Sequence, residues 1–167
     1  MSDQVELTDP VDHSVGGMYG HLFRRAFHIG MSVIPLVYYE YADELSDLAS
    51  ITELQLVSLL TFGIAFSEAV RLKLGITIFG QRDYESKQVS ALAWGGLAVG
   101  LTFLTLSEYP ELVWPLILSL SLGDPFLGEV RRKGNTARTV FISGSIFLAL
   151  IWIACWYQLG TPIWMAV

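Results

Sequence analysis

The sequence predicts an all-α, polytopic integral membrane protein with five transmembrane helices, and three observations lead to this fold class. Of the 167 residues, 53% are hydrophobic and 16% are charged, whereas an average soluble domain has about 25% charged residues. The apolar residues gather in segments close to the ~20 residues that a helix needs to cross a bilayer. The basic residues occur in alternate connections between these segments. Together these patterns argue against a soluble α/β enzyme.

Five apolar segments follow one another with short polar connections between them. They cover residues 26–41, 54–70, 89–107, 111–127 and 139–158. The first is the weakest, because Pro35 interrupts it. In the third, Gly96 and Gly100 are four residues apart, a spacing that lets a neighbouring helix approach closely. We expect these segments to form one helical domain over residues 21–167.

The first 20 residues differ from the rest of the chain. They contain four acidic residues but neither the basic stretch nor the apolar stretch of a signal peptide. We therefore expect a disordered acidic tail over residues 1–20. The single cysteine, Cys155, lies in an apolar segment, so the chain can form neither an internal disulfide nor a thiolate metal site.

The charges are distributed asymmetrically over the connections. The first and third connections contain seven acidic residues and no basic one: Glu40, Asp43, Glu44, Asp47, Glu53, Glu108 and Glu111. All ten Lys and Arg precede the first segment or lie in the second and fourth connections. The positive-inside rule then predicts a cytoplasmic N-terminus and an external C-terminus. The membrane is expected to be the plasma membrane.

Four ionisable residues lie at the predicted cytoplasmic ends of the helices: His28, Glu68, Arg71 and Asp124. Charge at membrane depth is costly and is usually functional. The Asp124 and Glu68 carboxylates are the hard oxygen ligands that Mg²⁺ prefers. Glu68 and Arg71 are three residues apart and share one helical face, so an ion pair could hold the carboxylate in place. The alternative is that this pair is only an interfacial salt bridge.

The segment from Gly123 to Gly128 reads Gly-Asp-Pro-Phe-Leu-Gly. Asp-Pro ends or kinks a helix, and flanking glycines can admit a phosphate to backbone amides. Arg131, Arg132 and Lys133 follow and could contact phosphate oxygens. Alternatively, the segment is an ordinary turn and the basic residues only orient the chain. His28, beside Arg24 and Arg25, is either part of the same site or an interfacial residue.

These motifs together resemble a known family. Arg-Arg-Ala-Phe-His-Ile-Gly at 24–30, the Glu68 and Arg71 pair, and Ser-Leu-Gly-Asp-Pro at 121–125 are similar to the dolichol kinase and phytol kinase family, over about residues 22–134. This family is distantly similar to phosphatidate cytidylyltransferases. The resemblance implies Mg²⁺-dependent transfer of the terminal phosphoryl group of CTP, or another nucleoside triphosphate, to a polyprenol hydroxyl.

The resemblance also implies roles for individual residues. Asp124 would bind the metal, Arg131 and Arg132 would contact phosphates, and His28 would share their pocket, with Glu85 at its rim. The candidate site comprises catalytic Asp124, His28 and Glu68, of which Asp124 and Glu68 bind Mg²⁺, and the substrate-binding residues Arg24, Arg25, Arg71, Gly123, Gly128, Arg131, Arg132 and Lys133. The expected partners are the nucleotide, a lipid alcohol and membrane lipids, but not nucleic acid.

Two differences from the family define the alternatives. Residues 135–139, Asn-Thr-Ala-Arg-Thr, replace the Lys-Thr/Ser-x-Glu-Gly element of the family, and the family commonly continues through further spans. The chain is therefore a short kinase, a homo-oligomer in which a second copy completes the site, or a non-catalytic membrane protein. A CDP-lipid synthase is the remaining enzymatic alternative.

Overall fold

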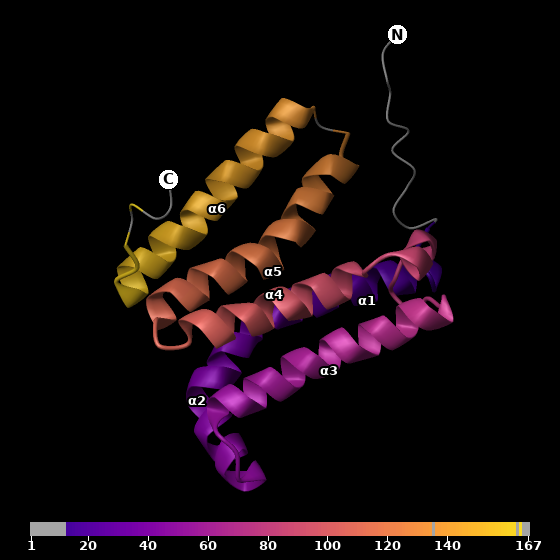
Figure 1. The fold of residues 1–167 in the computed structure, drawn as a ribbon. Coiled ribbons are helices and arrows are strands. Elements are labelled where there is room, and N and C mark those ends of the chain that lie inside the picture. The colour runs from indigo at the N-terminus through magenta and orange to yellow at the C-terminus, as the bar shows by residue number, and fades with distance from the viewer. Residues whose placement is uncertain (1–12, 135, 163, 165–167) are drawn as a thin grey trace.

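The computed structural model describes residues 13–134, 136–162 and 164, and the regular elements in this part of the chain are all helices (Figure 1). They are α1 (Gly17–Gly30), α2 (Ile34–Ala49), α3 (Glu53–Leu74), α4 (Ala91–Leu106), α5 (Pro110–Arg132) and α6 (Ala137–Leu159), with the short 3₁₀ helices η1 (Met31–Val33) and η2 (Asp83–Lys87). The all-α prediction is confirmed for these residues.

The first expected span is not a single helix. Residues 26–41 include the end of α1, the 3₁₀ turn η1 and the first half of α2, and α2 leaves α1 at an angle (Figure 1). Pro35 lies in the first turn of α2. Proline has no N–H to donate to the preceding turn, so it fits the start of a helix better than the middle. The proline therefore divides this apolar segment between two helices.

The other four expected segments each coincide with one helix, and local capping sets their limits. Thr52 and Gln55 form a capping box before α3, and Ser90 and Thr136 accept hydrogen bonds from Ala93 N and Thr139 N at the starts of α4 and α6. Gly75 and Gly160, with φ of 65° and 72°, end α3 and α6. Glycine adopts this left-handed conformation without strain. These caps explain why α3 and α6 extend beyond their apolar segments, whereas α4 begins only after Ser90 and is shorter than the expected 89–107.

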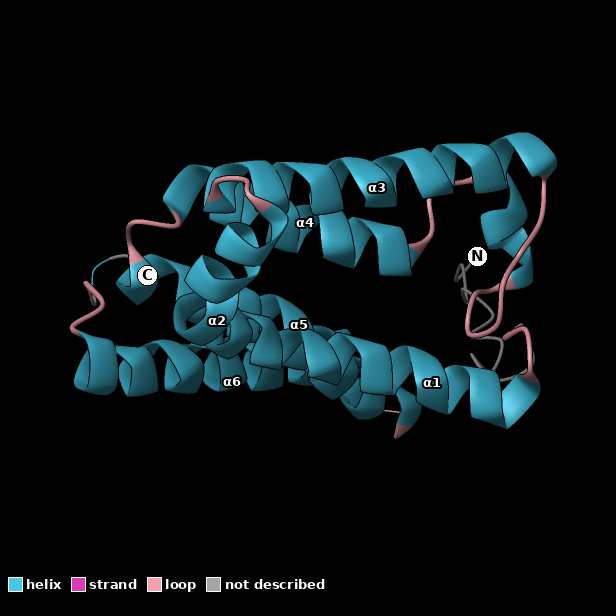
Figure 2. Ribbon diagram, turned by 90° about the horizontal axis from the view of Figure 1, so that it is seen from below, coloured by secondary structure: helices cyan, strands magenta, loops and turns pink. Residues whose placement is uncertain are grey.

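The helices form two layers, with α3 and α4 in one and α1, α5 and α6 in the other (Figure 2). Helix α4 packs on α3, α5 and α1, while α5 packs on α6 and α1. Gly96 and Gly100 of α4 face Ile64 and Thr61 of α3. This contact confirms that the two glycines serve helix packing.

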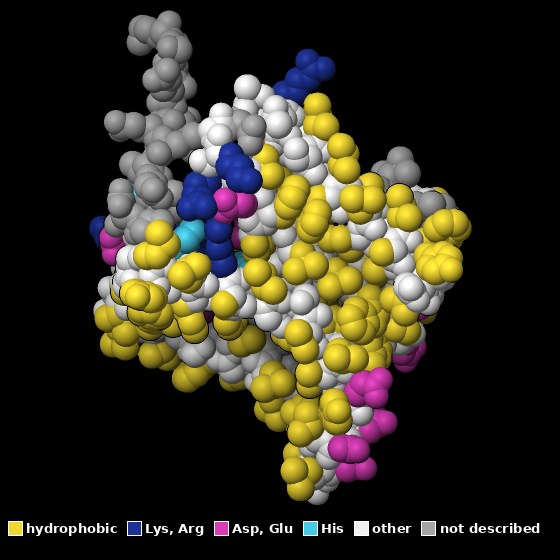
Figure 3. Space-filling view, turned by 180° about the vertical axis from the view of Figure 1, so that it is seen from behind, with side chains coloured by type: hydrophobic (Ala, Val, Ile, Leu, Met, Phe, Trp, Pro, Cys, Tyr) yellow, Lys and Arg dark blue, Asp and Glu magenta, His cyan; other side chains and the backbone are white. Residues whose placement is uncertain are grey.

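Two of the helices are candidate membrane spans by length and composition, namely α3 and α6. Little of either is buried inside the protein, and side chains such as Phe62 and Phe141 are exposed. Helix α4 is apolar but has 16 residues, which span ~24 Å against a hydrocarbon core of ~30 Å. Helix α5 includes Glu111, Asp124 and two internal prolines. The face seen in Figure 3 is mostly hydrophobic.

The N-terminal boundary differs from the expected one. Residues 1–12 of the expected tail lie outside the described residues. Residues 13–20, by contrast, belong to the fold, because Ser14 pairs with Arg82 in an isolated β-bridge and α1 begins at Gly17. Gly16 has a φ of 90°, and a Cβ there would collide with the Phe79 ring. The helical domain therefore starts before residue 21.

Candidate functional site

The charged residues separate to the two ends of the helices. The basic end is where α1, α4 and α6 begin and where α3 and α5 finish, and it carries the Lys and Arg residues. The opposite end carries most of the acidic side chains of α2 and its neighbouring turns. Figure 3 shows acidic side chains gathered at the lower tip and most Lys and Arg near the top. The candidate residues therefore share one end of the fold.

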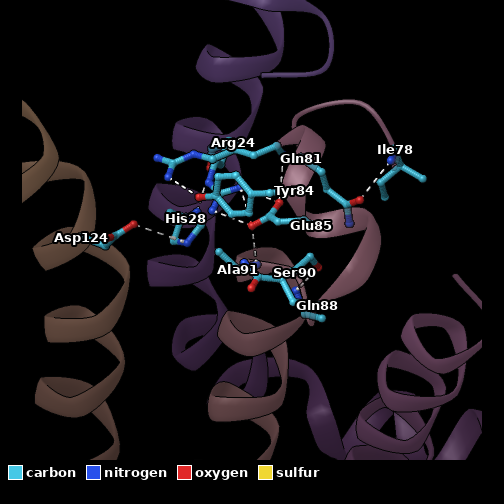
Figure 4. Close-up of polar contacts among 12 residues, drawn as sticks. Arg24, His28, Ile78, Gln81, Tyr84, Glu85, Gln88, Ser90, Ala91 and Asp124 are labelled. Atoms are coloured by element: carbon cyan, nitrogen blue, oxygen red, sulfur yellow. Dashed lines mark hydrogen bonds and ion pairs between the residues drawn. The ribbon is translucent and has the colours of Figure 1, made fainter. Parts of the chain in front are cut away.

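A buried carboxylate organises this end. Glu85, 2% exposed, accepts hydrogen bonds from both terminal nitrogens of Arg24 at 3.0–3.1 Å. It also accepts from the backbone N–H groups of Arg82 at 2.9 Å and Ala91 at 3.0 Å (Figure 4). Glu85 thus joins α1, η2 and the start of α4, so it is a structural anchor. It also lines a pocket of about 490 Å³ together with Arg24 and Trp94, in agreement with the rim position that the sequence suggested.

The pKa of Glu85 is lowered from its ordinary value. Burial alone raises the pKa, but the hydrogen bonds from Arg24 and from the Arg82 and Ala91 backbone outweigh it. Glu85 is therefore ionised at neutral pH, and its negative charge compensates the Arg24 guanidinium.

Glu68 and Arg71 form a second structural pair. The Arg71 guanidinium donates to both Glu68 carboxylate oxygens at 2.8 Å, and Glu68 also accepts from Ser90 N at 2.6 Å. Arg71 further donates to the carbonyls of Ile76, Glu85 and Gln88. Both residues are buried, and together they hold the loop between α3 and α4. Neither the interfacial salt bridge nor the catalytic role that the sequence suggested includes this function. The hydrogen-bond partners lie in the connection between α3 and α4, whose position cannot be predicted from helix periodicity.

His28 and Asp124 face each other across the α1–α5 contact (Figure 4). His28 Nε2 lies 3.7 Å from an Asp124 carboxylate oxygen, and the two side chains are 6% and 67% exposed. The other ring nitrogen, Nδ1, lies 2.9 Å from the Arg24 carbonyl oxygen one turn earlier. The backbone therefore orients the imidazole, while Asp124 stays open to solvent. The sequence predicted that these two residues share an end of the fold, and the structure brings them together.

A second ion-pair group lies beside His28. Glu129 of α5 accepts from Arg25 at 2.8 Å and from Arg132 at 2.9 Å. These hydrogen bonds lower the pKa of Glu129 to about 2. Gly128 faces Arg25, because a Cβ there would lie 3.9 Å from the guanidinium. Sequence reasoning missed Glu129, although its position between Asp124 and two arginines was a usable signal.

The basic run at the end of α5 is exposed. Arg131, Arg132 and Lys133 all face solvent. Arg131 also lines a crevice of about 500 Å³ between α5 and α6, next to Leu127 and Phe141. All three cations are therefore exposed to a phosphate ligand, although Arg132 already donates to Glu129. Arg24 and Arg71, by contrast, are buried against carboxylates.

The Gly-Asp-Pro segment does not form a phosphate cradle. Residues 123–128 continue as α-helix through Pro125, so the helix does not end there. Gly123 instead lies against Leu148 of α6, where a Cβ would be 3.4 Å from its side chain. In a helix interior the backbone amides bond within the helix and cannot bind an anion. The helical geometry therefore argues against an anion cradle made by the Gly123 and Gly128 backbone amides.

The site fits a magnesium ion only in part. Among the described residues, no group of three His, Cys, Asp or Glu side chains is placed to hold a metal ion. Glu68 has three acceptor positions occupied by Arg71 and Ser90, so it is poorly placed as a ligand. Asp124 has an exposed carboxylate. One carboxylate together with substrate phosphates is a usual magnesium site, so the donor set fits a metal that arrives with a nucleotide.

Comparison with known proteins returned no match, either to a family model, to a curated protein or to a solved structure. The functional argument for this chain therefore rests on its own geometry and on the sequence motifs described above.

Proposed function

We propose that the protein is a lipid kinase that transfers a phosphoryl group from CTP, or another nucleoside triphosphate, to a polyprenol or other isoprenoid alcohol. The observation that carries the proposal is the His28–Asp124 pair, a buried and oriented imidazole opposite an exposed carboxylate. It lies at the basic end, beside cations that can neutralise phosphates. The resemblance to the dolichol kinase and phytol kinase family supports the same activity.

The proposed topology has five membrane crossings. In it, α3 and α6 cross together with α4, α5 and the α1–α2 segment, the N-terminus is cytoplasmic and the C-terminus is outside. The ten basic residues and the seven acidic residues of the alternate connections support this arrangement. The site would then face the cytoplasm, where nucleotides are available, and the plasma membrane is the proposed location.

The proposed chemistry needs little beyond positioning and charge neutralisation. The hydroxyl oxygen of the alcohol attacks the terminal phosphorus, the bond from phosphorus to the bridging oxygen breaks, and the nucleoside diphosphate leaves. When His28 donates its Nδ1 proton to the Arg24 carbonyl, Nε2 has a free lone pair and accepts the hydroxyl proton. Asp124 then faces the imidazolium and stabilises its charge.

The remaining residues bind and organise. Arg131, Arg132 and Lys133 contact the phosphate oxygens from the end of α5. A bound Mg²⁺, held by Asp124 and the triphosphate, would neutralise charge on the phosphates. Glu85 and Glu68 act indirectly, because they fix Arg24 and the loop that precedes α4. This division of roles separates residues that touch substrate from residues that support the fold.

A transfer assay tests the proposal. Purified protein with Mg²⁺, radiolabelled CTP and a panel of long-chain alcohols should yield a lipid monophosphate and CDP. Asp124→Asn and His28→Gln should each lower kcat by about 10²-fold to 10⁴-fold, the usual contribution of a positioned acid or base. Asp47→Asn, the same change at an exposed position of the acidic end, is the matched control and should retain activity.

The products also separate the alternative functions. A CDP-lipid and pyrophosphate from a phospholipid substrate would identify a CDP-lipid synthase instead. A non-catalytic protein would give neither product and no thermal shift with millimolar CTP and Mg²⁺. Full activity of Asp124→Asn would remove this residue from the mechanism.

A further inference from the structure

A narrow apolar groove lies between α2 and α3, with α4 as its floor. Its volume is about 250 Å³. Val37 and Leu45 form the α2 wall, Leu56 and Leu60 the α3 wall, and Val99 and Phe103 the floor. A groove below the ~300 Å³ of typical ligand pockets suits a hydrocarbon chain better than a whole head group.

The described residues that line the groove offer almost no polar surface to a ligand. Of the described side chains that line it, Tyr38 and Thr61 are the two with polar atoms. Thr61 Oγ1 donates to the Val57 carbonyl at 2.8 Å. The Tyr38 hydroxyl is engaged by Glu53 and Ser107 at the acidic end of the fold. Cavities with such linings stay dry and take apolar ligands. This lining therefore favours an apolar ligand over a water-soluble one.

The open side of the groove continues into the apolar surface of a candidate membrane span. Leu60 on the α3 wall is 62% exposed, and Leu59 and Phe62 beside it are similarly exposed. On the opposite wall, Val37 and Leu45 also remain exposed. If α3 crosses the bilayer, the groove opens sideways into hydrocarbon. The occupant that the surroundings supply is then a lipid chain.

One end of the groove reaches the candidate site. Phe27 and Met31 line that end, and they lie on α1 and η1 next to His28. The Phe27 ring packs edge-on against the His28 ring, with 6.4 Å between centroids. Met31 packs closely against Gly95 of α4. The apolar lining thus ends at Phe27, whose ring contacts the His28 ring, while His28 itself does not line the groove.

We propose that this α2–α3 groove receives the hydrocarbon chain of the alcohol substrate, which enters sideways from the bilayer and presents its hydroxyl near His28. The identity of the head group rests on the proposed function. From Leu56 to Ile64 the α3 wall rises ~12 Å, so the groove holds the first part of a long chain and the rest extends into the membrane.

Photolabelling tests this without relying on activity. The probe is a long-chain isoprenoid alcohol with a diazirine in the chain, added to full-length protein in phosphatidylcholine vesicles without nucleotide. We expect the probe to label the α2 and α3 residues that line the groove. Leu60→Trp, which enlarges a lining side chain, should reduce this labelling at least fivefold. Leu59→Trp, on the same helix but outside the lining, is the matched control and should not.

Kinetics provide the second arm. In wild type, kcat/KM should rise with the chain length of the alcohol, by about fourfold for each methylene that becomes buried, and then level off once the groove is filled. Leu60→Trp should raise KM for long alcohols and leave short alcohols unchanged. These effects belong to chain binding, so they would not follow from a general loss of fold.

The possible outcomes separate the two proposals. Labelling of the groove by a protein that phosphorylates no alcohol would refute the kinase and leave the lipid groove standing. Phosphorylation combined with labelling spread evenly over the outer faces of α3 and α6, equal in both variants, would refute the groove alone. A dimer that Leu60→Trp dissociates, with no groove labelling, would show that a second copy covers this surface and would also overturn the inference.

Discussion

At the scale of single residues, the basic end contains two kinds of charged group. Glu85 and Glu68 are buried, and each compensates an arginine and caps backbone amides. Asp124 is exposed and faces an oriented histidine. Buried carboxylates with several donors are fixed in place, whereas an open carboxylate is available to a ligand. The geometry therefore ranks Asp124 above Glu68 as a functional residue.

The buried anchor makes a prediction about stability. Glu85→Gln should lower the free energy of unfolding by about 2–3 kcal/mol at neutral pH, because Arg24 loses its charged partner and the amides of Arg82 and Ala91 lose a carboxylate acceptor. Denaturant titration in detergent measures the change. Asp83→Asn, at an exposed position of the same 3₁₀ helix, is the control and should alter stability little.

The same anchor should respond to acid. The pKa of Glu85 is lower in the folded protein than its ordinary value of 4.5. A lowered pKa adds stability above the unfolded value, and this stability is lost as pH falls through the folded value. Wild type should therefore lose stability below about pH 4.5 more steeply than Glu85→Gln. Parallel curves for the two proteins would contradict this assignment of the anchor.

At the scale of helices, the sequence predicted which segments form helices better than where a helix is interrupted. Four apolar segments match α3, α4, α5 and α6, because a long run of apolar residues is itself a strong signal for a helix. Pro35 divided the first segment, and Pro125 did not end α5, although both are prolines. The difference lies in the surroundings, since α5 packs on α6, α1 and α4, whereas α2 has fewer packed neighbours. Tertiary packing of this kind has no local signal in the sequence.

The candidate site shows the same limit. His28 and Asp124 could be paired from the sequence because it predicts both near the cytoplasmic ends of their spans, although Asp124 lies inside α5 in the structure. The roles of Glu85 and Glu129 depend on partners 61 and 104 residues away, Arg24 and Arg25. Nothing in the spacing of one sequence indicates such a pair. Helix periodicity therefore predicted the end of the fold that holds the site but not its internal contacts.

The α3–α4 contact gives a prediction at this scale. A Cβ at Gly100 would collide with the Thr61 side chain, so Gly100→Val should destabilise the protein by about 1–3 kcal/mol. Gly63→Val on α3, where nothing lies within 4 Å of an added Cβ, is the matched control and should be tolerated. The double variant Gly100→Ala/Thr61→Ala should recover part of the stability that Gly100→Ala alone loses. Equal stability of the two valine variants would mean that α3 and α4 do not pack closely.

At the scale of the whole molecule, apolar surface and charge are arranged along one axis. Exposed apolar side chains cover the middle, while basic and acidic residues occupy opposite ends (Figure 3). Such a surface suits a bilayer better than water. Two helices are long and apolar enough to cross by themselves. The number of crossings then determines whether the basic residues all lie on one side of the membrane or are divided between both sides.

Cysteine accessibility distinguishes the two topologies. With five crossings, Asp47 and Glu108 lie on one side of the membrane and Lys87 on the other. If α3 and α6 alone cross, Lys87 and Glu108 share a side and Asp47 lies opposite. Asp47→Cys, Lys87→Cys and Glu108→Cys are made singly in a Cys155→Ala background, because Cys155 is the single native cysteine.

An impermeant maleimide added to intact cells, and then to permeabilised cells, reports the side of each cysteine. We expect Asp47→Cys and Glu108→Cys to react from outside, and Lys87→Cys to react only after permeabilisation, because the seven acidic and ten basic residues favour this orientation. If Lys87→Cys and Glu108→Cys both react in intact cells, the five-crossing topology is wrong and the two-crossing topology remains. In that topology Asp124 and Arg131 lie in the same connection as Lys87 and Glu108, across the membrane from Asp47. With a cytoplasmic N-terminus, this connection is outside the cell, where a nucleotide-dependent kinase has no nucleotide substrate.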